Sequence, residues 1–467
     1  MPPLQLQHSK TLAMVAFLAG FLSLKNANAA PPPMMIQATT DDNAPPNSAG
    51  LLGFLDGINR SNALLGDMWG LRRNLSSHGI SLGIQETSEY LGNLSGGTRQ
   101  GFEYDGLTQV VGQLNTQRAF GHYGGLFNIS FLNIHGKNLS TDNLQSLQTA
   151  SGIESAPSTR LWEAWYDQKF LDEDRLDVKV GQISIDQEFM VSNNALYFVN
   201  TMFGWPALPS YDMPGGGNAY PLSAFGARIS ARPVDGVTVL AGVFNGTPLG
   251  SNGDNLHGTS FPWSGGKLYI AEMQFAYPAL GSMVEPGQSQ PLGWTYRLGA
   301  WYNTRNDFSA ISASGQDAGL QYSGNYAVYA VADKLVWRDP IDPNRTVAVF
   351  GRVMGTPLTD RNLVDFSMNA GLVFHSFFRN RPADTFGVGM GYTHVSNQAP
   401  QQVLQNLDSI PRGEVFAELT YQYQLKPWIQ IQPDIQYVVN PGAGVVDTGD
   451  TRIKNELVVG VRTNISF

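Results

Sequence analysis

Isolated basic residues recur on the polar side of alternating segments, where they could bind hydroxyl groups or anions. Five of them share one parity: Lys179, Arg228, Arg297, Arg352 and Arg462. An arginine offers five donors in a rigid fork that suits adjacent hydroxyls, and it stays charged at ordinary pH. For any single arginine, solvation or pairing across strands is an equal alternative, so the hypothesis rests on the set.

Acidic and aromatic residues accompany these cations. Glu163 and Trp165 are assigned to the same polar side, but the parity of the segment 161–170 is ambiguous and both could lie on the opposite side. Asp186 and Glu188 follow in the next irregular stretch. Carboxylates among the basic residues would offset their positive field, so a neutral solute need not compete with anions for every arginine.

A long irregular stretch, residues 184–221, separates two alternating segments. Its 38 residues include the rings of Phe189, Tyr197, Phe198, Phe203, Trp205 and Tyr211. Structureless loops longer than about 15 residues are usually functional. Folded inward, these rings would offer flat faces to the C–H groups of a pyranose. The alternative, that a ring only packs the loop against its surroundings, is the better supported one for any single residue.

Composition limits what kind of scaffold carries these residues. The chain has 467 residues, no Cys, a net charge of −9 and only 14% charged residues. A disulfide scaffold and a Cys-ligated metal are excluded, and neither disorder nor electrostatic binding of nucleic acid is favoured. Glycine, at 51 of 467 residues, exceeds the usual share of about 7%. A helical protein is therefore disfavoured.

The dominant period from Ile80 to Phe467 is two, which is typical of β-strands. In the last segment, Leu457, Val459 and Val461 share one face, while Val458 and Arg462 share the other. We expect sixteen strands, placed near residues 80, 105, 125, 161, 175, 223, 237, 267, 293, 326, 345, 365, 385, 414, 428 and 455.

Several features indicate that the apolar faces meet lipid. Strands of ten or so residues match a tilted bilayer crossing of about 9 to 11. Aromatic residues gather near the ends of the apolar faces: Tyr302, Phe374, Tyr392, Tyr421, Tyr423, Tyr437 and Phe467. Closing the sheet would also satisfy every backbone group, as a lipid-facing structure requires. We therefore expect an all-β fold, a transmembrane antiparallel β-barrel of about 16 strands lined with polar groups.

The N-terminal region is expected to be separate from the barrel. An apolar run of 14 residues from Thr11 to Leu24, followed by small residues up to Ala29, predicts a signal peptide over residues 1–29. Residues 30–79 are interpreted as a linker and a short periplasmic helix, because apolar residues recur at helical spacing over 64–75. The barrel is expected to occupy residues 80–467, with the loop 184–221 folded into it.

Four segments together resemble the carbohydrate-selective outer-membrane porins of the OprB family. They are 162–166 (Trp-Glu-Ala-Trp-Tyr), 181–189, 220–228 and 432–437 (Gln-Pro-Asp-Ile-Gln-Tyr). The resemblance covers roughly Leu64 to Phe467, and the terminal Phe467 is similar to the aromatic end residue of outer-membrane barrels. It implies a sixteen-stranded barrel that passes monosaccharides, glucose above all, through an arginine-lined constriction in the outer membrane of a Gram-negative bacterium.

The favoured function is thus passive, selective diffusion of monosaccharides through an arginine- and aromatic-lined constriction. The open alternatives are a general or anion-preferring porin and, from another class, a secreted glycan-binding β protein. Expected partners are small-molecule sugars and outer-membrane lipid, not nucleic acid, and assembly as a homotrimer stays open.

No enzymatic activity, cofactor or metal is expected. The seven His residues lack metal-ligand spacing, and the sequence has no Gly-x-Ser-x-Gly, P-loop or zinc motif. Gly387, Gly389 and Gly391 recur at period two within a strand, which favours tight packing at the wall over a phosphate-binding loop.

Overall fold

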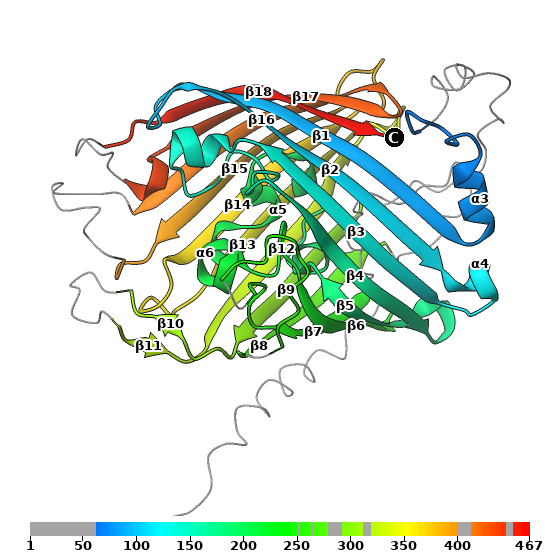
Figure 1. Ribbon diagram of the computed structural model, residues 1–467. Helices are drawn as coiled ribbons and strands as arrows, with labels where there is room; N and C mark the ends of the chain where they lie inside the picture. Colours follow the sequence, from blue (N-terminus) through cyan, green and yellow to red (C-terminus); the bar gives the residue numbers. More distant parts are fainter. Residues whose placement is uncertain are drawn as a thin grey trace, which may run out of the picture.

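The computed structural model describes residues 62–250, 253–263, 265–278, 292–311, 319–399, 412–444 and 452–467. Sixteen antiparallel strands form one closed barrel, in which each strand pairs with its neighbour in sequence and β18 returns to pair with β1 (Figure 1). The number of strands and the position of each confirm the expectation from the period-two pattern.

The barrel strands have the following bounds: β1 Ile80–Ser95, β2 Gly101–Asn115, β3 Gly125–Gly136, β4 Ser158–Phe170, β5 Leu176–Ile183, β6 Ala224–Val234, β7 Val237–Asn245, β8 Lys267–Tyr277, β9 Trp294–Asn303, β12 Asn325–Arg338, β13 Thr346–Gly355, β14 Val364–His375, β15 Thr385–Val395, β16 Gly413–Lys426, β17 Ile429–Val439 and β18 Glu456–Ser466. A separate two-stranded sheet pairs β10 Phe308–Ser309 with β11 Gln321–Tyr322. The helices are α3 Leu71–Ser77, α4 Thr116–Phe120, α5 Thr201–Gly204 and α6 Ala207–Asp212.

The two ends of the barrel differ in their connections. At one end, next to α3 and α4, strands are joined mostly by short turns, such as residues 171–175 and 427–428. At the other end the connections are longer, and the longest joins β5 to β6. Bacterial outer-membrane barrels have short periplasmic turns and longer extracellular loops. We refer to the two ends as the short-turn end and the long-loop end.

The N-terminal helix begins later than the sequence pattern predicts. The helix expected over 64–75 is observed as α3, Leu71–Ser77, and turns occupy the residues before it. Met68, Trp69 and Gly70 have φ angles of 50°, 57° and 89°, which a right-handed helix does not allow. The side chain of Asp67 accepts a hydrogen bond from the Arg73 backbone N–H at 3.0 Å, so it satisfies a donor in the first turn.

A bulge explains the ambiguous parity of the segment 161–170. The pairing of β3 with β4 shifts between Ser130 and Phe131, and the extra residue on β4 is Trp162. A bulge inserts one residue and changes which side chains point inward. Trp162 and Glu163 are therefore both buried, although they are neighbours in a strand. Glu163 lies on the inside, on the same side as its hydrogen-bond partner Ser184 in the loop.

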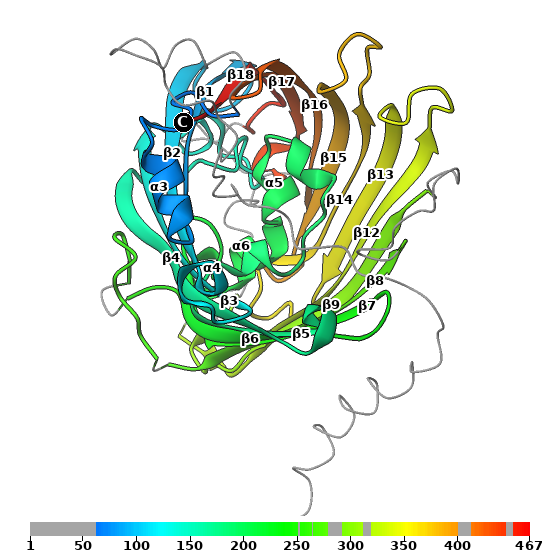
Figure 2. The same cartoon turned by 90° about the vertical axis from the view of Figure 1, so that its right-hand side faces the viewer.

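The hydrophobic core of this protein lies inside the barrel. Short helices between β5 and β6 enter the space enclosed by the strands, where α5 and α6 are seen end-on in Figure 2. The ring of Phe203 packs against Phe350 and Phe416 of the wall, with ring centroids 5.7 and 5.3 Å apart. The expected inward folding of the loop thus appears as a buried apolar contact with β13 and β16.

Glycines on β15 make room for these rings. A Cβ atom on Gly389 would lie 2.5 Å from the Phe203 ring and 2.8 Å from the Phe198 ring. Gly387 faces the Phe198 ring in the same way, at 2.9 Å. The period-two glycines therefore pack against the inner loop.

We expect Gly389→Ala to lower the free energy of unfolding in detergent by about 1–3 kcal/mol, because the added methyl group overpacks the Phe198 and Phe203 rings. Denaturant titration of the folded barrel measures this loss. Gly351→Ala is the matched control, since its Cβ would meet nothing closer than an atom at 3.9 Å. Equal stability of the two variants would show that the rings do not press on β15.

Candidate functional site

The inner loop, which we define as residues 184–223 between β5 and β6, is the candidate site. It contains α5, α6 and three 3₁₀ turns, Ile185–Gln187, Ala195–Tyr197 and Pro214–Gly216. The Asn200 side chain accepts a hydrogen bond from the Met202 N–H at 2.9 Å and so begins α5. Because a loop inside a barrel has little access to water, its backbone groups need partners from the wall.

Wall carboxylates supply acceptors for the backbone N–H groups of the inner loop. Glu163 accepts from Ser184 at 3.0 Å, and Glu272 accepts from Met190 at 2.8 Å. The remaining contacts are Asp333 with Asn194 at 3.1 Å and Glu418 with Val199 at 2.7 Å and Asn200 at 3.0 Å. Hydrogen bonds to charged acceptors are about twice as strong as neutral ones. These carboxylates therefore fix the path of the loop along the wall.

Arg352 on β13 provides the matching donors. Its guanidinium donates to the carbonyl oxygens of Met190, Met202, Phe203 and Gly204 at 2.7, 2.6, 2.9 and 3.1 Å. The side chain is only 3% exposed. Its donors are thus directed at four carbonyl groups of the inner loop.

A second group of charges joins the wall to the start of the inner loop. Glu188 forms ion pairs with Lys179 on β5 and with Arg228 on β6, the latter at 3.0 Å. Arg228 also contacts Asp177 and lies 3.8 Å from Asp167. This group therefore balances two cations with three carboxylates.

Two further arginines pair with wall carboxylates. Arg297 is 1% exposed and lies 3.9 Å from Glu272 and 3.6 Å from Asp333, measured between charged atoms. Arg462 on β18 pairs with Glu89 on β1 and approaches the Val199 carbonyl at 3.5 Å. The five basic residues of the sequence pattern all lie on the inner side of the barrel.

The remaining predicted residues also lie inside. Lys179 places its ammonium group 4.1 Å from the centroid of the Trp165 ring. Phe189 is fully buried, and Trp205 donates its indole N–H to the Gly216 carbonyl at 2.8 Å. Asp186 accepts from the Ser184 hydroxyl and the Tyr220 N–H at 2.6 and 3.0 Å, while burial raises the pKa of its carboxyl group. Contact of any of these residues with a solute stays a prediction.

Sequence reasoning missed the carboxylates that hold the inner loop. Glu272, Asp333, Glu414 and Glu418 were not among the predicted site residues, yet each accepts backbone N–H groups of a loop. The signal was available for Glu418, because it is the charged residue on the polar face of the segment 415–425. An acidic residue at inward parity, opposite an irregular stretch rich in N–H groups, is the pattern to seek.

A second loop, residues 137–157 between β3 and β4, supports the first and was also missed. The Thr201 N–H donates to the Thr149 carbonyl at 3.1 Å, and the Gly152 N–H donates to the Val199 carbonyl at 2.9 Å. Glu414 on β16 accepts from Leu147 and Gln148 N–H groups, both at 2.7 Å. The two loops therefore form one layer inside the barrel.

The described residues contain no cluster of side chains suited to a metal ion. Among the helices in the described ranges, none has the length and apolarity needed to cross a bilayer.

Comparison with known proteins decides the family. Residues 99–467 match the family described as "Carbohydrate-selective porin, OprB family". The chain belongs to this family. Its members are channels and not enzymes, which confirms the expectation that this chain is not an enzyme.

Individual relatives agree over most of their lengths. "Porin B" of Pseudomonas aeruginosa is 25% identical over 444 residues, which cover 86% of this chain and 91% of that protein. "Putative porin QuiX" of Acinetobacter baylyi is 20% identical over 433 residues, or 86% of this chain and 93% of that protein. The high-pH structure of Pseudomonas putida OprB has the same fold, with a TM-score of 0.74, 24% identity and coverage of 88% of this chain and 99% of its own.

We expect Arg352→Met to raise the single-channel conductance of this porin severalfold, because four carbonyl groups of the inner loop lose a charged donor worth about 1.5–3 kcal/mol per bond. Recordings in planar bilayers measure the effect. Arg352→Lys should restore part of the narrow conductance. Arg73→Met is the control, since Arg73 pairs with Asp67 outside the barrel. Unchanged conductance in Arg352→Met would contradict the role of Arg352.

The second loop should respond to pH through Glu154. Burial raises the pKa of its carboxyl group from the ordinary 4.5 to about 7, and the nearby Glu89 carboxylate adds to the shift. The folded state thus keeps a proton that the unfolded chain releases. The resulting stability is complete below the ordinary pKa and is lost as the pH rises through about 7.

We therefore expect amide hydrogen exchange in residues 137–157, corrected for its intrinsic pH dependence, to become faster between about pH 5 and pH 9. Glu154→Gln should remove this change, because an amide does not ionise. Glu173→Gln, at an exposed turn, should leave it intact. A pH response that persists in Glu154→Gln would rule out this carboxyl group as its source.

Proposed function

We propose that this porin allows passive, selective diffusion of monosaccharides of the glucose type across the outer membrane of a Gram-negative bacterium. Export would use residues 1–29 as a cleaved signal peptide; that segment and most of the expected linker lie outside the described residues. The family assignment supports a carbohydrate channel, and the expected sugar follows from the resemblance in the sequence.

The single observation that carries this proposal is the fixed inner loop. A sixteen-stranded barrel leaves an aqueous channel unless something narrows it. Here both apolar rings and wall charges hold residues 184–223 within the strands (Figure 2). A constriction of fixed shape can distinguish solutes by size and by the hydroxyl groups that they present.

We infer that the sugar path follows the wall of β18 and β1 to β5, towards the short-turn end. The inner loop packs mainly on β7 to β17, through residues such as Phe244, Phe350 and Phe416. Partly exposed polar or aromatic side chains point inward on the remaining wall: Gln85, Gln113, Trp165, Lys179, Gln430 and Asn464.

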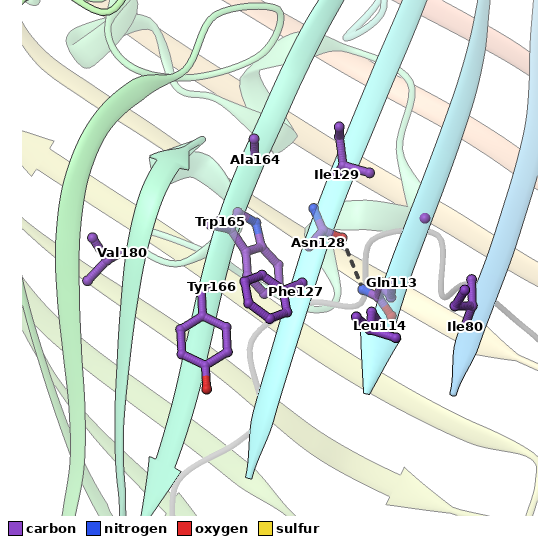
Figure 3. A pocket seen from close by; sticks show the side chains of 11 residues that line it. Ile80, Gln113, Leu114, Phe127, Asn128, Ile129, Ala164, Trp165, Tyr166 and Val180 are labelled. Atoms are coloured by element: carbon purple, nitrogen blue, oxygen red, sulfur yellow. Dashed lines mark hydrogen bonds between the residues drawn. The ribbon is translucent and has the colours of Figure 1, made fainter. Parts of the chain in front are cut away.

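The chemistry of this wall suits a neutral, hydroxyl-rich solute. Trp165 offers an aromatic face beside the Lys179 ammonium group, at 4.1 Å from the ring centroid. Gln113 donates to the Asn128 side-chain oxygen at 3.1 Å, so an amide pair lies on the two preceding strands (Figure 3). Aromatic faces and amides together recognise the apolar and polar sides of a pyranose.

The anion-preferring alternative has less support. Arg228, Arg297 and Arg462 each pair with at least one carboxylate, and Arg352 binds backbone carbonyl groups. The positive field of the predicted arginine set is therefore largely offset within the wall. A reversal potential without anion preference is expected in a salt gradient.

We expect glucose to permeate liposomes containing this porin severalfold faster than a non-sugar solute of similar size, such as a neutral peptide. Trp165→Ala should reduce that ratio, because the solute loses an aromatic face. Phe127→Ala is the control, since Phe127 pairs with Tyr166 on the outer face of the next strand. Equal rates for both solutes would leave only a general pore, and equal ratios in both variants would exclude Trp165 from the path.

A further inference from the structure

Polar side chains interrupt the outer wall of the barrel over β1, β2 and β3. We define the outer patch as Glu86, Ser88, Tyr104, Thr108, Asn133 and His135. Their parity is that of the exposed Tyr90, Ile129 and Phe131, whereas the neighbours Leu91 and Leu132 are buried on the inner side. The outer patch thus faces away from the channel.

Hydrogen bonds join the members of the outer patch. Glu86 accepts from the Thr108 and Ser88 hydroxyls at 2.5 and 3.2 Å and lies 3.4 Å from the His135 ring nitrogen. The Tyr104 hydroxyl lies 3.2 Å from the Ser88 hydroxyl and 3.3 Å from His135. Glu86 and His135 nevertheless keep 19% and 36% of their side-chain surfaces exposed.

The rest of the outer wall sets the contrast. On β9, β14 and β17, every outward side chain is aliphatic or aromatic, as lipid requires. Leu298 and Val328, on the wall far from β2 in the strand order, are each 57% exposed. A carboxylate and an imidazole in contact with acyl chains would be unfavourable, and charged residues there are rare.

The depth of the outer patch argues against a lipid head group as its partner. Thr108 lies at the middle of β2, which runs from Gly101 to Asn115. The stacked rings of Tyr90 and Phe102, 5.2 Å apart, lie nearer to the long-loop end of the same strands. Aromatic girdles mark the level of the head groups, so the outer patch reaches into the apolar band. Glu86 would also repel an anionic head group.

Next to the outer patch, the wall has both a hollow and projecting side chains. A hollow of about 540 Å³ is lined by small Gly112 and Ala164 and by Ile129, Tyr166 and Val180 (Figure 3). Phe131, 42% exposed, projects between the hollow and the outer patch. A surface that carries donors, acceptors, a hollow and a projecting ring can be complementary to itself, as contacts between identical subunits require.

We propose that the outer patch is the contact face between two copies of this chain, with the patch of one copy facing that of another. This inference rests on the membrane placement proposed above. In the contact, hydroxyl, amide and imidazole groups of the second copy replace acyl chains around Glu86. Apolar side chains such as Phe131 enter the hollow of the other copy.

Native mass spectrometry of the full chain in mild detergent tests the proposal. Wild type should be oligomeric, and the double variant Glu86→Leu with His135→Leu should dissociate at least tenfold more readily. The control is Leu298→Ala with Val328→Ala, equally exposed on another part of the wall, which should remain oligomeric. A monomeric wild type, an oligomer that survives the patch variant, or a monomer whose anionic lipid is lost in the patch variant would each overturn the proposal.

A second measurement covers a patch variant that fails to fold. The chain has no Cys, so Thr108→Cys introduces a single thiol into the outer patch, and oxidation in intact membranes should give a band of doubled mass. Val328→Cys should give none. Bands from both sites, or from neither, would contradict the proposed face. Sugar permeation by the dissociated variant separates this result from the channel function, because each barrel encloses its own path.

Discussion

The backbone of the inner loop needs hydrogen-bond partners, and the barrel wall has to provide them. Inside a closed sheet, the N–H and C=O groups of residues 184–223 have neither bulk water nor a regular helix of useful length. Wall carboxylates accept from the N–H groups, and Arg352 donates to four carbonyl groups. The polar inner face therefore serves the loop as well as any passing solute.

This requirement also accounts for the balance of charge within the barrel. A carboxylate that accepts loop N–H groups is buried and needs a nearby cation, and an arginine that holds the loop needs nearby carboxylates. Arg297 between Glu272 and Asp333 shows both needs met at once. The same pairs reduce the field that an anion would feel, so selectivity for neutral solutes is compatible with a highly charged wall.

The sequence predicted the architecture well because strand periodicity is local. Sixteen strands, their approximate starts, and the inward parity of Lys179, Arg228, Arg297, Arg352 and Arg462 follow from alternation. The bulge at Trp162 defeats alternation, since one extra residue changes the parity within a strand. The late start of α3 depends on positive φ angles that apolar spacing does not reveal. Which carboxylate meets which loop N–H depends on contacts over 80 to 220 residues, which no local pattern encodes.

The pairing of the first and last strands has a consequence for biogenesis. β18 pairs with β1, the Phe467 N–H donates to the Ile84 carbonyl at 2.9 Å, and Arg72 contacts the Phe467 carbonyl oxygen. No cylinder can therefore close until the ribosome has added the last strand. During synthesis and transit, β1 keeps an unpaired edge, which invites aggregation. A holding chaperone in the periplasm would shield that edge until the final strand arrives.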